Sequence, residues 1–171
     1  MFDLLSRSVN ILDSLAQCIS GDTQFGMFKG ISVFMELYPQ LQKLRCQGDR
    51  EVGTIVPVNL GEKFIYNLIT KPRFWNKPTT ASIYTSLRSM KYHAIDCQVS
   101  DIAVPFLGAG CDKMDFYNDV LPLIEDLFRD TSINIHIYSL QSNSFSTYLN
   151  RFVVFLNQYT FKLIYTLPYY W

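Results

Sequence analysis

Apolar residues occur along this chain in two arrangements, short runs and runs with helical spacing. The short runs cover residues 13–20, 101–107 and 133–140. In the last of them isoleucines alternate with polar residues, the pattern of a strand with one buried face. These runs predict three strands, and residues 13–20 could form an inner strand of the sheet.

Two further strands are predicted at residues 54–58 and 63–70, which flank the turn sequence Asn-Leu-Gly-Glu. Two such runs joined by a short polar segment are typical of a β-hairpin. Pro57 has no backbone N–H to donate to a neighbouring strand, so the first strand of the pair should lie at an edge of the sheet.

Three segments have apolar residues at helical spacing: residues 31–45, a segment that opens after Pro78, and a segment that starts near Asn118. Pro39 should kink or restart the first of these helices. Strands interleaved with helices predict an α/β layered domain with a mixed sheet. The residues expected on the buried faces of the last two helices are Ile83, Leu87, Met90, Ala94, Val120, Ile124 and Leu127.

The composition is that of a globular chain and shows no bias toward nucleic acid. A length of 171 residues suits one domain with one core. Apolar residues make up 49% and charged residues 18% of the chain, unlike a disordered segment. The 15 basic and 15 acidic side chains cancel, so net charge does not steer the protein toward bare nucleic acid.

The four cysteines are scattered and form no C-x-x-C pair, and the only histidines are His93 and His136. We therefore expect no metal site and no cofactor, and we interpret both histidines as structural. A reduced protein of the nucleus or cytoplasm fits this cysteine usage better than a secreted one. Residues 1–10 lack the pattern of a signal peptide. We also expect a monomer.

Residues 141–171 differ from the rest, with ten aromatic residues compared with sixteen in the first 140. The stretch is long enough to span a membrane. However, Asn157, Gln158 and Lys162 lie in its middle, and a central lysine alone costs roughly 2.5–3.5 kcal/mol on insertion. We expect an appended packing segment, or a non-native extension of the reading frame, and no membrane span.

Two glycine loops and two charged residues are candidates for chemistry. The strand at 101–107 runs into Gly108-Ala109-Gly110, and a second glycine loop at 25–32 also precedes a predicted helix. Glycines without Cβ let backbone N–H groups approach an anion, and ligands of open α/β sheets collect at the carboxyl ends of strands. A tight connection that binds nothing would look the same. Likewise, Asp112 could merely cap a helix, and Lys71 could be a solvated strand end.

Four segments carry a resemblance to a known family: DSLAQCIS, KFIYNLITK, NKPTTASIYTSLRSMKYH and VPFLGAGCDK. In this order and spacing they resemble a macrodomain. More closely, they resemble the terminal ADP-ribose protein glycohydrolase branch, also called the O-acetyl-ADP-ribose deacetylase. The similarity covers about residues 3–140, and residues 141–171 have no family counterpart. The I-T-K and G-x-G-x-D elements are specific to the branch.

The resemblance implies a three-layer α/β/α sandwich that binds ADP-ribose across the strand ends. It implies release of ADP-ribose from glutamate and aspartate side chains of proteins, and deacylation of O-acyl-ADP-ribose. It makes Lys71 the catalytic nucleophile toward the distal ribose and Asp112 the residue that helps to release the adduct. The substrate-binding positions that it implies are Asp3, Ser20, Gly30, Ile31, Ser32, Gly108, Ala109, Gly110 and Cys111.

The chain also departs from the family pattern. The family's first strand has almost no counterpart, because only two residues precede Asp3, and the loop at 23–32 is about two residues longer and poorer in glycine. An ADP-ribose reader without turnover is therefore the alternative to an enzyme, and a product that folds poorly is a third reading. The sequence also leaves open whether Asp112 lies beyond the ribose or accepts the proton of Lys71.

Overall fold

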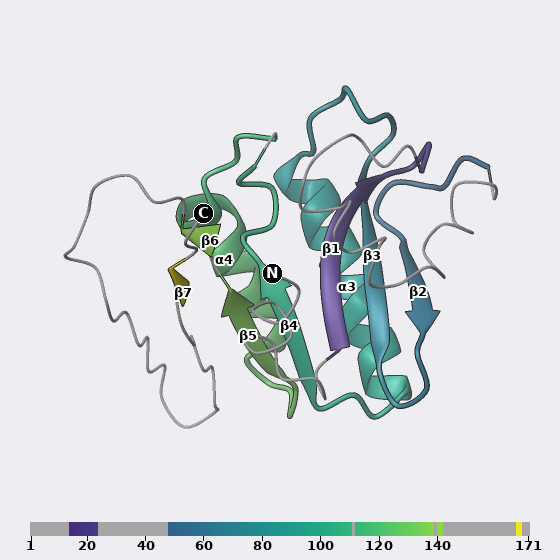
Figure 1. Cartoon of the computed structure of the whole chain (residues 1–171), viewed down its shortest axis with the longest axis vertical. Helices are drawn as coiled ribbons and strands as arrows, with labels where there is room; N and C mark the ends of the chain where they lie inside the picture. Colours follow the sequence, from purple (N-terminus) through teal and green to yellow (C-terminus); the bar gives the residue numbers. More distant parts are fainter. Residues whose placement is uncertain (1–13, 24–47, 111, 139, 142–166, 169–171) are drawn as a thin grey trace.

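The computed structural model describes residues 14–23, 48–110, 112–138, 140–141 and 167–168. Within these residues, five strands form one mixed sheet in the order β2-β3-β1-β4-β5 (Figure 1). All of these strands are parallel except β2, which runs antiparallel to β3. The strands are β1 (Ser14–Ser20), β2 (Ile55–Asn59), β3 (Phe64–Lys71), β4 (Asp101–Pro105) and β5 (Asn134–Tyr138). The predicted α/β class is confirmed.

The central position of β1 follows from its sequence, since apolar and small residues let it be buried on both faces. It pairs with β3 along its whole length from Leu15 and with β4 at its start. The prediction of an inner strand is therefore confirmed. The hairpin is confirmed as well, because β2 and β3 pair antiparallel, and β2 with Pro57 is an edge strand of the sheet.

The long helix α3 (Thr80–Asp96) begins where the sequence predicts. Thr79 and Ser82 form a capping box, in which each side chain bonds the other residue's backbone N–H, and this satisfies donors that a helix start leaves free. The four residues predicted for its buried face, Ile83, Leu87, Met90 and Ala94, are all fully buried.

The next helical segment begins close to the predicted start near Asn118. A π-helical turn, η2 (Phe116–Val120), precedes α4 (Leu121–Phe128). The carboxylate of Asp115 accepts the backbone N–H groups of Tyr117 and Asn118, so Asp115 caps the turn. The helical segment thus begins two residues before Asn118, close to the predicted start. Pro122 lies in the first turn of α4, where a missing N–H is tolerated.

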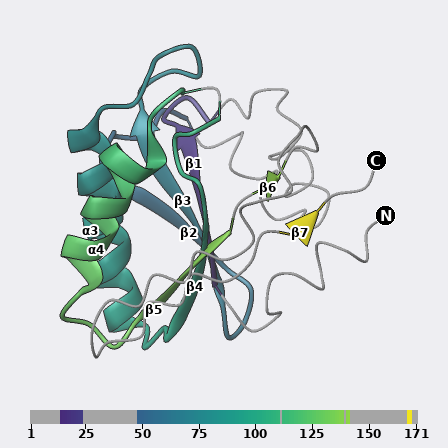
Figure 2. The same ribbon diagram turned by 90° about the vertical axis from the view of Figure 1, so that its left-hand side faces the viewer.

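Two apolar clusters fill the two faces of the sheet. Helices α3 and α4 lie on the same face (Figure 2) and pack on the larger cluster, which includes Tyr66 and Leu68. The other face buries a second cluster of Leu15, Ile19, Ile65, Ile69 and Ala103. Burial of both faces agrees with a layered sandwich. The helix predicted at 31–45 lies outside the described residues.

The predicted strands at 101–107 and 133–140 are shorter than expected. The first ends at Pro105, because the Ala109 N–H bonds the Phe106 carbonyl and closes a turn there. The second ends at Tyr138, and β6 (Leu140–Gln141) then pairs in parallel with β7 (Leu167–Pro168). Residues 1–13 and most of 141–171 lie outside the described part. None of the helices in the described ranges is long and apolar enough to cross a bilayer.

Candidate functional site

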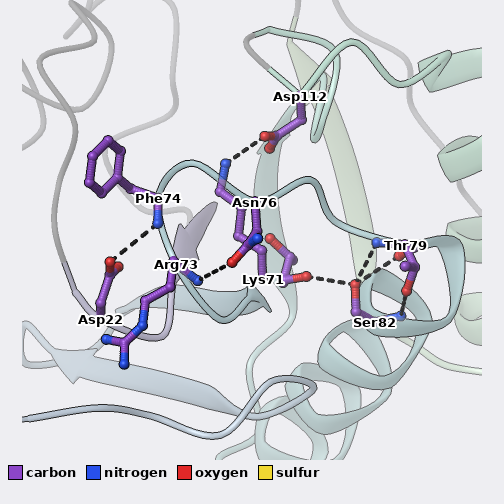
Figure 3. A network of polar contacts seen from close by, with 9 residues as sticks. Asp22, Lys71, Arg73, Phe74, Asn76, Thr79, Ser82 and Asp112 are labelled. Atoms are coloured by element: carbon purple, nitrogen blue, oxygen red, sulfur yellow. Dashed lines mark hydrogen bonds and ion pairs between the residues drawn. The ribbon is translucent and has the colours of Figure 1, made fainter.

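Lys71 and Asp112 meet at the carboxyl ends of the parallel strands. The Lys71 Nζ lies 2.5 Å from Asp112 Oδ1, in a direct ion pair (Figure 3). Lys71 is the last residue of β3, and Asp112 follows β4, which lies on the other side of β1. Their side chains are only 11% and 14% exposed, so both charges are largely shielded from water.

The end of β3 is irregular at the point where it delivers Lys71. Ile19 of β1 faces Ile69, but the next residue, Ser20, faces Lys71, which leaves Thr70 as an extra residue. Such a bulge re-aims the side chains that follow it. The bulge therefore helps to decide where the amine points.

The backbone around Lys71 is fixed from two sides. From α3, the Ser82 hydroxyl donates to the Thr70 carbonyl at 2.6 Å. From the turn after β1, the Gly21 N–H donates to the Lys71 carbonyl at 2.8 Å. A Cβ on Gly21 would lie 2.4 Å from the Arg50 carbonyl oxygen, so only glycine allows this close approach.

The glycine loop after β4 closes on itself. Gly108 adopts a φ of +73°, and its carbonyl accepts the Met114 N–H at 3.0 Å. Lys113 is also left-handed, with φ of +54°, and its N–H donates to the Gly110 carbonyl. Gly110 itself is exposed, and a Cβ placed on it would meet nothing within 4 Å. The middle of the loop is thus open to a ligand beside Asp112.

The structure brings six of the predicted site residues to this end of the sheet. Ser20, the last residue of β1, is buried beside the end of β3. Gly108, Ala109 and Gly110 precede Asp112 in the loop after β4, and Lys71 completes the set. The other predicted positions, Asp3, Gly30, Ile31, Ser32 and Cys111, lie outside the described residues.

Cys18 belongs to the surroundings of the site, although the sequence analysis did not single it out. Burial and the nearby charge of Asp112 raise the pKa of the Cys18 thiol to about 12, while the charge of Lys71 acts in the opposite direction. The strand pattern could have located it, because Cys18 and Ser20 share one face of β1. The thiol is therefore protonated at neutral pH.

Solved structures place this fold in a known class. The macrodomain of Thermus aquaticus DarG matches with a TM-score of 0.65 and 19% identity, over 74% of this chain and 89% of that one. The macrodomain of Mycobacterium tuberculosis DarG matches equally well, at 21% identity over 74% and 88%. Thermosipho africanus DarTG in complex with ADP-ribose has a TM-score of 0.59 at 19% identity, over 75% and 38%. The fold is that of a macrodomain.

Sequence comparison then gives the family. ADP-ribose glycohydrolase OARD1 of Homo sapiens is 37% identical over 129 residues, which are 75% of this chain and 82% of the relative. The Bos taurus protein of the same name is 36% identical over the same length. No protein-family model matches the chain. At this identity and coverage, the chain belongs to the ADP-ribose glycohydrolase OARD1 family of macrodomain proteins.

Proposed function

We propose that this protein binds ADP-ribose and removes it from glutamate and aspartate side chains of modified proteins, and that it also deacylates O-acyl-ADP-ribose. The observation that carries the proposal is the 2.5 Å contact between Lys71 and Asp112 at the strand ends of a macrodomain. The name of the human relative, ADP-ribose glycohydrolase, and the ADP-ribose complex of a structural neighbour support it.

The glycine loop after β4 is the proposed cradle for the diphosphate and the distal ribose. Gly110 is exposed and leaves room at its Cβ position, so a phosphate oxygen can approach the backbone closely. Hydrogen bonds from N–H groups to such an anion are worth about 1.5–3 kcal/mol each. Bound there, the ligand would bring its distal ribose to Lys71 and Asp112.

In the proposed reaction the Lys71 amine attacks the anomeric carbon of the distal ribose. A C–N bond forms, the C–O bond to the side-chain acyl group breaks, and the carboxylate leaves. The amine must first give up its extra proton, because only the neutral amine has a lone pair with which to attack. The Asp112 carboxylate touches the ammonium, which supports Asp112 as the proton acceptor. Water then hydrolyses the lysine adduct: its oxygen bonds to the anomeric carbon as the C–N bond breaks, and its surplus proton passes to solvent. The protonated Asp112 returns its proton to the departing amine.

The same contact also supports the alternative function, an ADP-ribose-binding module without turnover. As long as the proton stays on Lys71, the ion pair neutralises Asp112 and the ammonium has no lone pair with which to attack. A protein in this state would hold ADP-ribose through the glycine loop without turning it over.

Binding is tested first, by calorimetry with ADP-ribose and with AMP. We expect heat with ADP-ribose and much weaker binding of AMP, which lacks the distal ribose. Folded protein that gives no heat with ADP-ribose would refute both the enzyme and the reader.

Turnover is then tested with a protein carrying ADP-ribose on glutamate. Lys71→Ala should abolish release of ADP-ribose while largely keeping binding, and Lys71→Arg should not rescue it, since a guanidinium stays protonated. A Lys71→Ala variant that releases ADP-ribose at the wild-type rate would disprove the mechanism.

Asp112→Ala separates the two roles that Asp112 could have. If Asp112 accepts the proton of Lys71, the variant should be inactive and carry no adduct. If Asp112 acts only after the attack, a covalent ADP-ribose adduct should accumulate on Lys71. Intact-protein mass spectrometry with peptide mapping distinguishes the two, and the contact in the structure favours the first.

A further inference from the structure

Two aromatic side chains stand exposed just after the candidate nucleophile. Phe74 and Trp75 are 46% and 67% exposed and follow Lys71 by three and four residues. Their rings meet edge to face with centroids 4.8 Å apart. Tyr117, which follows Asp112 in sequence, is also exposed. Exposed aromatic residues next to a site are typical of contact surfaces, because Trp, Tyr and Phe dominate the energetic centres of interfaces.

The turn that carries Phe74 and Trp75 is held in one shape by polar contacts. The Phe74 N–H donates to the Asp22 carboxylate at 3.2 Å (Figure 3). The Arg73 N–H donates to the Asn76 side chain at 3.2 Å, and the Asn76 N–H donates back to the Arg73 carbonyl at 3.0 Å. A surface held in this way loses little conformational entropy when a partner binds.

The chemistry of the site indicates what lies against this surface. The anomeric carbon at Lys71 carries the modified side chain, and that side chain is joined to a polypeptide, which must leave the site past the segments that flank Lys71. We infer that Phe74 and Trp75 bind the polypeptide on either side of the modified residue. The inference rests on the proposed function.

The charges of the turn favour a polypeptide over a nucleic acid. Lys71 is paired with Asp112, and Arg73 is paired with Asp49 at 2.9 Å. These two cations are therefore already partly neutralised, and the exposed Lys77 of the same turn is matched in charge by the Asp22 carboxylate that accepts the Phe74 N–H. A nucleic-acid site needs several lysines and arginines directed at phosphates. An apolar aromatic surface with balanced charge suits peptide side chains and backbone.

The experiment compares three ligands in the Lys71→Ala background, so that binding is measured without turnover. They are a peptide with ADP-ribose on a glutamate, an oligonucleotide with ADP-ribose on its terminal phosphate, and free ADP-ribose. We expect Trp75→Ala to weaken binding of the modified peptide at least about fivefold and to change binding of free ADP-ribose less than twofold. Phe74→Ala should act in the same direction.

Tyr92→Ala is the matched control. Tyr92 is an aromatic residue of similar exposure, 60%, on the second half of α3, about 18 Å along the helix from the end near Lys71. It should alter none of these dissociation constants. Thermal melting confirms that each variant is folded.

Several outcomes would overturn the inference. Trp75→Ala could weaken binding of the peptide and of free ADP-ribose equally, or of neither, or it could weaken binding of the oligonucleotide but not of the peptide. If free ADP-ribose does not bind at all, the proposed function fails and this inference fails with it. If free ADP-ribose binds and only the peptide effect is absent, the proposed function stands and the inference alone is wrong.

Discussion

Gly108 and Gly110 lie two residues apart in one loop, but they are constrained differently. Gly108 has a φ of +73°, and a Cβ on it would lie 3.0 Å from the Met114 sulfur. The fold itself therefore favours glycine at this position. Gly110 has no positive φ and no atom within 4 Å of a Cβ placed on it. Nothing in the described residues requires glycine at position 110, which agrees with the proposed approach of a ligand to this part of the loop.

Gly110→Ala should consequently weaken ligand binding without lowering stability. We expect the free energy of unfolding to change by less than about 0.5 kcal/mol. Affinity for ADP-ribose should fall about tenfold or more, because a methyl group would displace the phosphate from a hydrogen bond worth about 1.5–3 kcal/mol. Thermal melting and calorimetry measure the two effects. Gly108→Ala is the contrasting variant, expected to lower the melting temperature, and wild-type affinity in Gly110→Ala would remove this glycine from the site.

At the scale of elements, Asp101 joins the starts of β4 and β5. Its carboxylate accepts hydrogen bonds from Ser100 Oγ at 2.7 Å, His136 Nε2 at 2.9 Å and Asn134 Nδ2 at 3.0 Å. Partial burial acts to raise the pKa of Asp101, but these hydrogen bonds outweigh it and hold the pKa below its ordinary value. His136 is thus a structural residue, as the sequence suggested. His93 is structural as well, lying edge-on to Phe64 and Tyr66.

The lowered pKa of Asp101 determines the sign of its effect on acid stability. The folded protein keeps this carboxylate ionised to lower pH than the unfolded chain does, so its contribution is complete above the unfolded pKa, near 3.9. The contribution is lost as the pH falls through the lower, folded pKa. Asp101→Asn should lower stability by about 1–2 kcal/mol at pH 7, and the difference from wild type should shrink toward pH 3.

Melting temperatures of wild type and Asp101→Asn between pH 7 and pH 3 measure this effect. Asp130→Asn, at an exposed carboxylate after α4, is the control and should follow wild type throughout. A gap between wild type and Asp101→Asn that stays constant across this range would show that the charge of Asp101 does not carry the effect.

The elements that were predictable are those whose pattern is local. Two strand-like runs joined by a short turn predicted the hairpin. Helical spacing predicted the buried face of α3, because burial of one face repeats with a fixed period. The start of η2 was predicted only to within two residues, because it depends on whether the Asp115 side chain caps the turn. The bulge opposite Ser20 could not be predicted from the sequence, since the register between β1 and β3 depends on residues fifty positions apart.

The candidate site was predictable only in part. The glycine loop suggested an anion site on physical grounds, but the roles of Lys71 and Asp112 came from the family resemblance. Their contact joins residues 41 positions apart, which no spacing rule links. The segment that contains Phe74 and Trp75 was predicted only as a loop, because a sequence does not distinguish an exposed aromatic residue from a buried one.

For the molecule as a whole, the two outer strands of the described sheet differ in how they are covered. At one edge, β2 carries Pro57, which blocks pairing with a further strand. At the other edge, β5 pairs with β4 alone within the sheet, and β6 follows it almost at once. The pairing of Leu140 with Leu167 joins residues near the end of the chain to the end of the macrodomain. This contact supports a packing role for the C-terminal segment.

Truncation after Leu140 should therefore lower the melting temperature or the solubility of the protein, because it removes β7 and leaves Leu140 without its pairing partner Leu167, so that its backbone groups are open to other chains. The matched control ends at Pro168, keeps β7, and should melt with the full chain. Thermal melting and light scattering measure both effects. A ligand at 100 times its dissociation constant adds about 2.7 kcal/mol to the free energy of unfolding. Thermal melting with ADP-ribose therefore shows whether the truncated protein still binds the ligand. A chain ending at Leu140 that melts no lower and stays soluble would make residues 141–171 dispensable for folding.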